Sequence, residues 1–134
     1  TGFESVFSYR RPSAAQAETI SNLLARLDHP RLTPSLLEQP FAALSAGDQA
    51  LILLLRALEN APPPPALENP PPLLVLDEPF SGMDHETVGK VHRFLNEELE
   101  PEQALVLITH YEQEIPDSVG RVLRLENGSV VERT

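Results

Sequence analysis

The chain has 134 residues, 20 acidic against 10 basic side chains, a formal net charge of −10 and no cysteine. This length allows one modest domain with a buried core. The acidic balance argues against a nucleic-acid interface or an anionic membrane surface, because both are bound through basic patches. Without cysteine, disulfides, thiolate metal sites and cysteine nucleophiles are excluded. The longest apolar run, residues 50–55, is too short to span a bilayer. Because Thr1 is not methionine, we expect a piece of a longer protein.

The first part of the chain predicts helices. Residues 1–12 mix aromatic and turn-forming residues and predict an irregular lead-in. Apolar residues at helical spacing predict a helix over residues 13–28, with Ser13 as its N-cap. A short helical turn should follow over residues 33–39, where Pro40 closes the segment.

A strongly apolar helix is predicted over residues 46–59, with Ser45 as its N-cap. Residues 51–55 are apolar on nearly every side of this helix, which indicates that it is buried. The next segment, residues 61–72, contains seven prolines in twelve residues, so we expect an exposed polyproline-type loop. This loop is either a stiff insertion or a docking site for an aromatic-lined groove.

The second half of the chain predicts an α/β fold. Two short apolar runs, residues 73–76 and 104–108, are typical of strands buried on both faces of a parallel sheet. A helix is predicted between them over residues 85–99, with Asp84 as its cap. This strand–helix–strand order predicts a βαβ crossover, and the turn sequence Glu126-Asn-Gly128 predicts a final hairpin.

Polar residues follow both predicted parallel strands at the point where each strand ends. Asp77 and Glu78 follow the first strand, and His110 follows the second, so all three should lie at the same rim of the sheet. Oxygen ligands suit Mg²⁺, and a neighbouring carboxylate can orient or deprotonate a water molecule. Each residue alone could be a solvated loop charge. Together they predict metal-assisted hydrolysis of a phosphoanhydride.

The order of these segments resembles that of ATP-binding-cassette (ABC) ATPases. Residues 73–78 resemble the Walker B strand, Ser81-Gly-Met-Asp84 resembles the D-loop, and His110 resembles the switch histidine. Leu44-Ser-Ala-Gly-Asp-Gln49 is similar to the signature motif, usually written LSGGQ. Near the start, residues 2–9 resemble soluble tandem-cassette proteins of the molybdate-ATPase and photorepair type through Gly2, Phe3 and Tyr9.

The resemblance implies the C-terminal part of a P-loop NTPase domain. Residues 44–134 would carry the signature, Walker B, D-loop and H-loop segments, with 61–72 as a proline-rich insertion, and residues 1–43 would be part of a helical subdomain. The sequence has no Gly-x-x-x-x-Gly-Lys-Ser/Thr loop, and its only lysine is Lys90, so the Walker A half is absent from it. Such a fragment should expose apolar surface and an unpaired sheet edge.

The resemblance also implies a role for each residue of the Walker B and H-loop segments. Asp77 should bind Mg²⁺, and Glu78 should be the general base that polarises the attacking water. His110 should contact the γ-phosphate of ATP.

The signature segment is implied to contact ATP held by an opposite cassette. Ser45 and Gly47 should touch its γ-phosphate, with Asp48 and Gln49 beside them, and Asp84 should communicate across the dimer interface. A carboxylate near a triphosphate is electrostatically unfavourable, so Asp48 should turn away. The alternative for Ser45 is a plain helix cap.

The implied function is that of an ABC-type ATPase fragment. It would bind and hydrolyse ATP with Mg²⁺ at a dimeric composite site and be inactive without the upstream Walker A half. Expected partners are ATP, a second cassette, and a transporter or other protein, with no nucleic acid and no direct membrane span. The expected location is intracellular, in the cytoplasm or on the matrix side of an organelle.

Two alternatives stay open at this point. One is a non-catalytic ABC-like interaction or regulatory module. The other is the C-terminal lobe of a chromosome-maintenance or repair ATPase, against which the missing heptads in residues 1–40 and the acidic charge argue. The histidines outside the motifs, His29, His85 and His92, are expected to be surface residues, because nothing near them completes a metal-ligand set.

Overall fold

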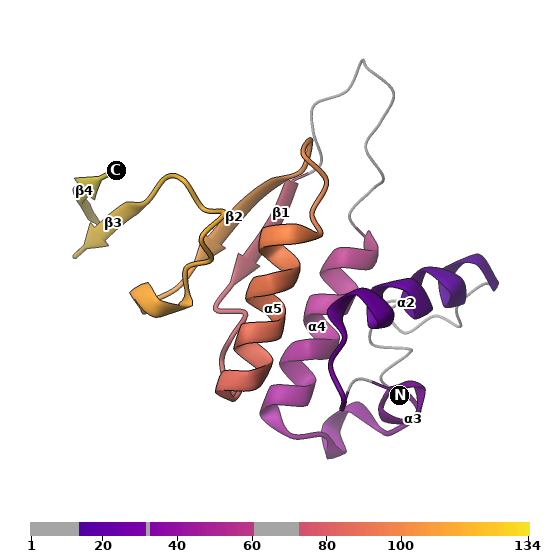
Figure 1. The fold of residues 1–134 in the computed structure, drawn as a ribbon. Helices are drawn as coiled ribbons and strands as arrows, with labels where there is room; N and C mark the ends of the chain where they lie inside the picture. Colours follow the sequence, from indigo (N-terminus) through magenta and orange to yellow (C-terminus); the bar gives the residue numbers. More distant parts are fainter. Residues whose placement is uncertain (1–13, 32, 61–72) are drawn as a thin grey trace.

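The computed structural model describes residues 14–31, 33–60 and 73–134 (Figure 1). The predicted lead-in at residues 1–12, with its family-like residues Gly2, Phe3 and Tyr9, lies outside the described residues, as do the predicted cap Ser13 and the proline-rich segment 61–72.

The observed elements follow the predicted order. In chain order they are α2 (Ala14–Leu27), α3 (Pro34–Leu37), the 3₁₀ turn η1 (Phe41–Ala43), α4 (Ala46–Asn60), β1 (Leu73–Asp77), α5 (His85–Glu97), β2 (Ala104–Ile108), the 3₁₀ turn η2 (Glu112–Glu114), β3 (Leu123–Glu126) and β4 (Ser129–Arg133). No helix of the described residues has the length and apolar character needed to cross a membrane.

Local signals explain where the helices begin and end. Helix α2 ends at Leu27, and the next residue, Asp28, has a φ of 49° in the left-handed region that terminates helices. Helix α3 begins after Thr33, whose Oγ1 accepts a hydrogen bond from the backbone N–H of Leu36 at 3.4 Å. Helix α5 begins after Asp84, whose Oδ1 accepts from the backbone N–H of Thr87 at 2.8 Å.

The strands form two separate two-stranded sheets. Strands β1 and β2 pair in parallel, in a register that runs from Leu73 opposite Ala104 to Asp77 opposite Ile108, so the predicted parallel sheet is confirmed. Strands β3 and β4 pair antiparallel as the predicted hairpin. Its turn residues Asn127 and Gly128 have φ of 48° and 77°, as a hairpin turn with two left-handed residues requires.

Helices α4 and α5 lie on one face of the β1–β2 sheet, and α2 contacts both helices (Figure 1). The core between them is made mainly of leucine, isoleucine, valine and phenylalanine side chains from α2, α3, α4, β1 and α5. Its most deeply buried members are Leu27, Leu37, Ile52, Leu55 and Val91. The predicted apolar faces of these helices therefore meet in one hydrophobic core.

The other face of the parallel sheet stays bare among the described residues. Leu73 and Val75 of β1 are 59% and 52% exposed, and Val106 and Ile108 of β2 are also exposed. The prediction that both strands are buried on two faces is wrong for these residues, because side chains alternate along a strand and the helices cover only one side. Leu53 of α4 is exposed for a similar reason, although its helix was predicted to be buried. The expected exposed apolar surface is therefore present.

Candidate functional site

The carboxyl ends of β1 and β2 bring together the predicted Walker B and H-loop residues. Asp77 is the last residue of β1 and pairs in register with Ile108, the last residue of β2. The next residue, Glu78, places Oε1 3.1 Å from Nε2 of His110. Parallel pairing thus delivers two carboxylates and an imidazole to one rim of the sheet, as predicted from their position after the strands.

Glu78 has an unusual backbone conformation. Its φ is 49°, in the left-handed region that costs a residue with a Cβ about 1 kcal/mol or more. Its backbone N–H donates to the carbonyl of Ile108 at 2.8 Å, which continues the sheet by one hydrogen bond. The strained turn at Glu78 redirects the chain away from the strand while its carboxylate stays beside His110. Backbone strain of this kind is typical of functional sites.

The side chain of Glu78 has hydrogen-bonding capacity to spare. Its Oε1 is buried and has no hydrogen-bond partner among the described residues, because the contact with His110 at 3.1 Å lacks hydrogen-bond alignment. An unsatisfied buried carboxylate oxygen is costly for stability. It is also the feature that a residue needs in order to accept a hydrogen bond from water.

The loop that carries His110 is fixed by its neighbours. Thr109 donates its hydroxyl to a carboxylate oxygen of Glu114 and accepts the backbone N–H of Tyr111 at 3.2 Å. From α5, Nε2 of His92 lies 2.9 Å from the carbonyl oxygen of Glu114. The ring of His92 also meets Phe80 edge-on at 5.1 Å between centroids. His92 therefore links the turn after Glu78 to the loop of His110.

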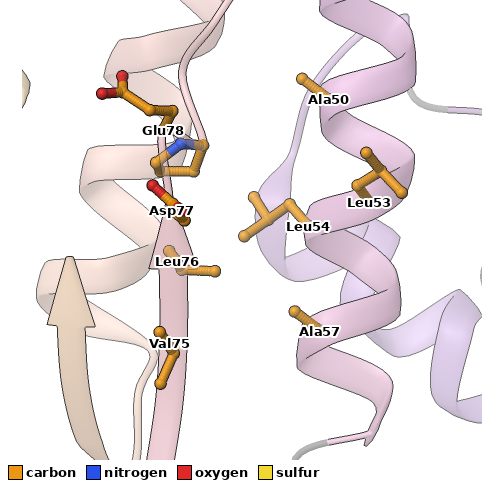
Figure 2. A pocket seen from close by; sticks show the side chains of 9 residues that line it. Ala50, Leu53, Leu54, Ala57, Val75, Leu76, Asp77 and Glu78 are labelled. Atoms are coloured by element: carbon orange, nitrogen blue, oxygen red, sulfur yellow. The ribbon is translucent and has the colours of Figure 1, made fainter. Parts of the chain in front are cut away.

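An apolar hollow of about 200 Å³ lies between α4 and β1, and Asp77 and Glu78 are part of its wall (Figure 2). The apolar part of the wall comes from Leu53 and Leu54 of α4 and from Val75 of β1. The hollow shares this wall with the bare face of the sheet, because Leu53 and Val75 are both about half exposed. Asp77 and Glu78 line the hollow, but Figure 2 shows the carboxylate of Glu78 pointing away from α4.

The signature segment forms the first turn of α4. Ser45 Oγ accepts the backbone N–H of Asp48 at 3.2 Å, so the predicted N-cap is observed. Gln49 donates its side-chain amide to the carbonyls of Phe41 and Leu44, at 3.1 Å and 3.3 Å. The side-chain amide of Gln49 therefore holds η1 against α4. Its nitrogen is already engaged in these two hydrogen bonds.

The signature segment packs directly against the D-loop. A Cβ added to Gly47 would lie 2.8 Å from the carbonyl oxygen of Gly82, a distance that real Cβ atoms essentially never show. Gly82 itself has a φ of 78°, and a Cβ there would meet the Cβ of Ala46 at 2.9 Å. Two glycines thus permit the close approach of two backbones. Among the described residues, no hydrogen bond or ion pair joins Ser45 to Glu78.

Asp48 of the signature segment is buried and paired. Nη2 of Arg31 lies 2.7 Å from each of its carboxylate oxygens, and Nη1 of the same guanidinium lies 3.8 Å from Oδ2 of Asp84. The carboxylate of Asp48 thus faces Arg31, and its turning away from a bound phosphate stays a prediction. Sequence reasoning missed Arg31, because nothing in its neighbourhood marks it as a partner of residues 17 and 53 positions away.

His29 is not a surface residue, contrary to prediction, and His92 is only partly exposed, whereas His85 is exposed as expected. His29 is 6% exposed, and its Nε2 lies 2.8 Å from Oγ1 of the buried Thr87. Its Nδ1 accepts the backbone N–H of Arg31 at 3.2 Å, which requires the tautomer with a proton on Nε2. Burial is possible because both ring nitrogens have partners.

The pKa of Asp84 lies below its ordinary value of 3.8. The main cause is the hydrogen bond from the backbone N–H of Thr87, and the positive charge of Arg31 acts in the same direction. The D-loop carboxylate is therefore ionised at neutral pH and holds the first turn of α5.

The strand-end groups fit a magnesium ion that is bound together with a nucleotide. Among the described residues, no group of three or more His, Asp or Glu side chains converges as a set of metal ligands. Mg²⁺ is commonly held by one or two carboxylates together with phosphate oxygens and water. Asp77, the last residue of β1, supplies one such carboxylate at the rim of the sheet.

Comparison with known proteins gives a consistent set of relatives, although no protein-family model matches the sequence. An ABC transporter ATP-binding protein of Schizosaccharomyces pombe is 33% identical over 131 residues, which are 98% of this chain and 24% of that protein. The lipoprotein-releasing system ATP-binding protein LolD of Nitrobacter winogradskyi is 31% identical over 117 residues, 87% of this chain and 46% of LolD. The ABC transporter ATP-binding protein ModF of Escherichia coli is 30% identical over 115 residues, 85% of this chain and 21% of ModF.

The chain thus spans less than half the length of these relatives. Among solved structures, the dimeric structure of a bacterial ABC transporter cassette matches with a TM-score of 0.63 and 19% identity, over 99% of this chain and 53% of that chain. The fold is therefore that of part of an ABC cassette, with a parallel sheet and flanking helices. The chain belongs to the ABC ATP-binding-cassette family and corresponds to the C-terminal half of its nucleotide-binding domain.

Proposed function

We propose that this chain supplies part of an ATPase site that binds and hydrolyses ATP with Mg²⁺ between two cassettes, and that it is inactive without the Walker A half. The observation that carries the proposal is the meeting of Glu78 and His110, 3.1 Å apart, at the rim where Asp77 ends its strand. In the proposed division of the chain, residues 1–43 belong to the helical subdomain and residues 44–134 carry the motifs.

Each strand-end residue has a distinct part in the proposal. Asp77 would hold Mg²⁺, which when bound neutralises charge on the phosphates. Glu78 would orient the attacking water and accept its proton at Oε1, the buried oxygen that has no other partner among the described residues. His110 is 86% exposed, so its ring can contact the γ-phosphate while it stays beside Glu78.

The signature segment would act on ATP held by a second cassette. Ser45 and Gly47 lie at the N-terminus of α4, where backbone N–H groups favour an anion. In such a composite site, one cassette would contribute its signature segment to one ATP and its strand-end residues to another. The contact of Gly47 with Gly82 gives a direct route by which the D-loop, with Asp84, would sense the partner.

The partners in this proposal are ATP, a second cassette in a homodimer or within one chain, and a transporter or other protein. An intracellular location, in the cytoplasm or on the matrix side of an organelle, is part of the same proposal, because the site needs a supply of ATP. The relatives named as ABC transporter ATP-binding proteins support the transporter among these partners.

The test is Mg-ATP binding and turnover by this chain alone and by a longer protein that includes the Walker A half. We expect no turnover by the chain alone, and turnover by the longer protein that Glu78→Gln reduces at least about 100-fold while ATP binding persists. The matched control is Glu126→Gln, which neutralises an exposed carboxylate on β3 and should leave turnover unchanged. Turnover by the isolated chain, or full activity of Glu78→Gln, would refute the assignment. If the longer protein bound ATP without hydrolysing it, the result would support a non-catalytic interaction or regulatory module.

A further inference from the structure

Asp48 places a negative charge inside the segment that should face a phosphate. It is the only acidic residue in the signature segment, residues 44–49, and it is 8% exposed. A buried carboxylate is costly unless it is paired. Both of its oxygens lie 2.7 Å from Nη2 of Arg31, and Arg31 is the only ion-pair partner of Asp48 among the described residues.

Arg31 is held in this position from more than one side. It lies in the connection between α2 and α3, and its backbone N–H donates to the buried ring of His29 at 3.2 Å. His29 is anchored in turn to Thr87 of α5. The far nitrogen of the guanidinium, Nη1, lies 3.8 Å from the D-loop carboxylate of Asp84. The positive charge is therefore shared between the signature segment and the D-loop.

We propose that Arg31 is a positioning residue that compensates the charge of Asp48, so that the acidic signature segment can receive a phosphate. This inference rests on the proposed function, and it adds a residue outside every segment that resembles a motif. The electrostatic reason is direct: an unpaired carboxylate at the N-terminus of α4 opposes the helix dipole that favours an anion. With Arg31 in place, the Asp48–Arg31 pair is neutral.

The experiment is a double-mutant cycle in the full-length protein, with KM for ATP and kcat as readouts. Arg31→Ala should raise KM about tenfold, the scale of one uncompensated unit charge near an anion. In an Asp48→Asn background, where no charge needs compensation, Arg31→Ala should raise KM less than about threefold. A purely structural role for Arg31 predicts the same change in both backgrounds, and that result would overturn the proposal.

Two further arginine variants keep the test decisive if Arg31→Ala does not fold. Arg31→Lys retains the charge and should stay within about threefold of wild type, whereas Arg31→Gln retains most of the length without the charge and should behave like Arg31→Ala. Equal KM values for the lysine and glutamine variants would overturn the proposal. The matched control is Arg26→Ala, which removes a partly exposed arginine of α2 that pairs with Glu98 and should leave KM unchanged.

The two proposals fail in different ways. If the wild-type protein neither binds nor hydrolyses ATP, the proposed function is refuted and the role of Arg31 falls with it. If the wild type hydrolyses ATP but Asp48→Asn does not suppress the effect of Arg31→Ala, only the role of Arg31 is refuted.

Discussion

Replacing Gly47 by alanine tests the close approach between the signature segment and the D-loop. Alanine is a better helix former than glycine by about 1 kcal/mol, so the change would stabilise a helix with free space around that residue. At Gly47 the added Cβ would lie 2.8 Å from the carbonyl oxygen of Gly82, a backbone atom that cannot rotate away. Overpacking of this kind costs about 1–3 kcal/mol. We therefore expect Gly47→Ala to lower the free energy of unfolding by up to about 2 kcal/mol.

Gly89 provides the matched control in the neighbouring helix. It lies within α5, and a Cβ added there meets no atom within 4 Å. Gly89→Ala should therefore raise the free energy of unfolding by about 0.5–1 kcal/mol, so urea denaturation should separate the two variants by about 0.5–3 kcal/mol. If Gly47→Ala stabilised the protein as much as Gly89→Ala does, the two backbones could not be in contact and the proposed link between signature and D-loop would be refuted.

Three other predictions test the framework of the site. Asp84 has a lowered pKa when folded, so its stabilising effect is present above about pH 4 and is lost as the pH falls through the folded pKa. Thermal unfolding should therefore show Asp84→Ala to be less stable at pH 7, with the difference fading toward pH 3. Leu55 is fully buried, so Leu55→Ala should cost about 2–5 kcal/mol in urea denaturation. His92→Phe keeps a ring against Phe80 but loses the hydrogen bond to Glu114, and should cost about 1 kcal/mol by the same assay.

The sequence was sufficient where a signal lies within one short segment. Asp84 and Ser45 were predicted as caps because capping depends on a side chain and the backbone three residues further on. The meeting of Glu78 and His110 was also predictable, although they are far apart in sequence, because each directly follows a strand or lies two residues beyond it. Parallel pairing then places both at one rim without any knowledge of side-chain packing.

Strand burial shows a different limit. The all-apolar runs of β1 and β2 are what strands covered on two faces require, yet Leu73 and Val75 are exposed. An all-apolar strand is suited to being covered on both faces. Its exposure in the structure depends on which residues lie around it. The chain spans less than half of each curated relative discussed above. The pattern therefore identified the strands correctly and predicted their cover wrongly.

The pairing of Asp48 could not have been predicted, because its partner depends on how the chain turns after α2. Asp28 ends that helix with a φ of 49°, and the bond of His29 to Thr87 then fixes the connection against α5. This path brings Arg31 to Asp48. Considered alone, the signature segment places the unfavourable charge of Asp48 beside the expected phosphate. In the folded chain, Arg31 supplies the opposite charge from 17 residues away. An electrostatic objection to an altered motif residue must therefore be judged with its three-dimensional neighbours, and at Asp48 that neighbour is the oppositely charged Arg31.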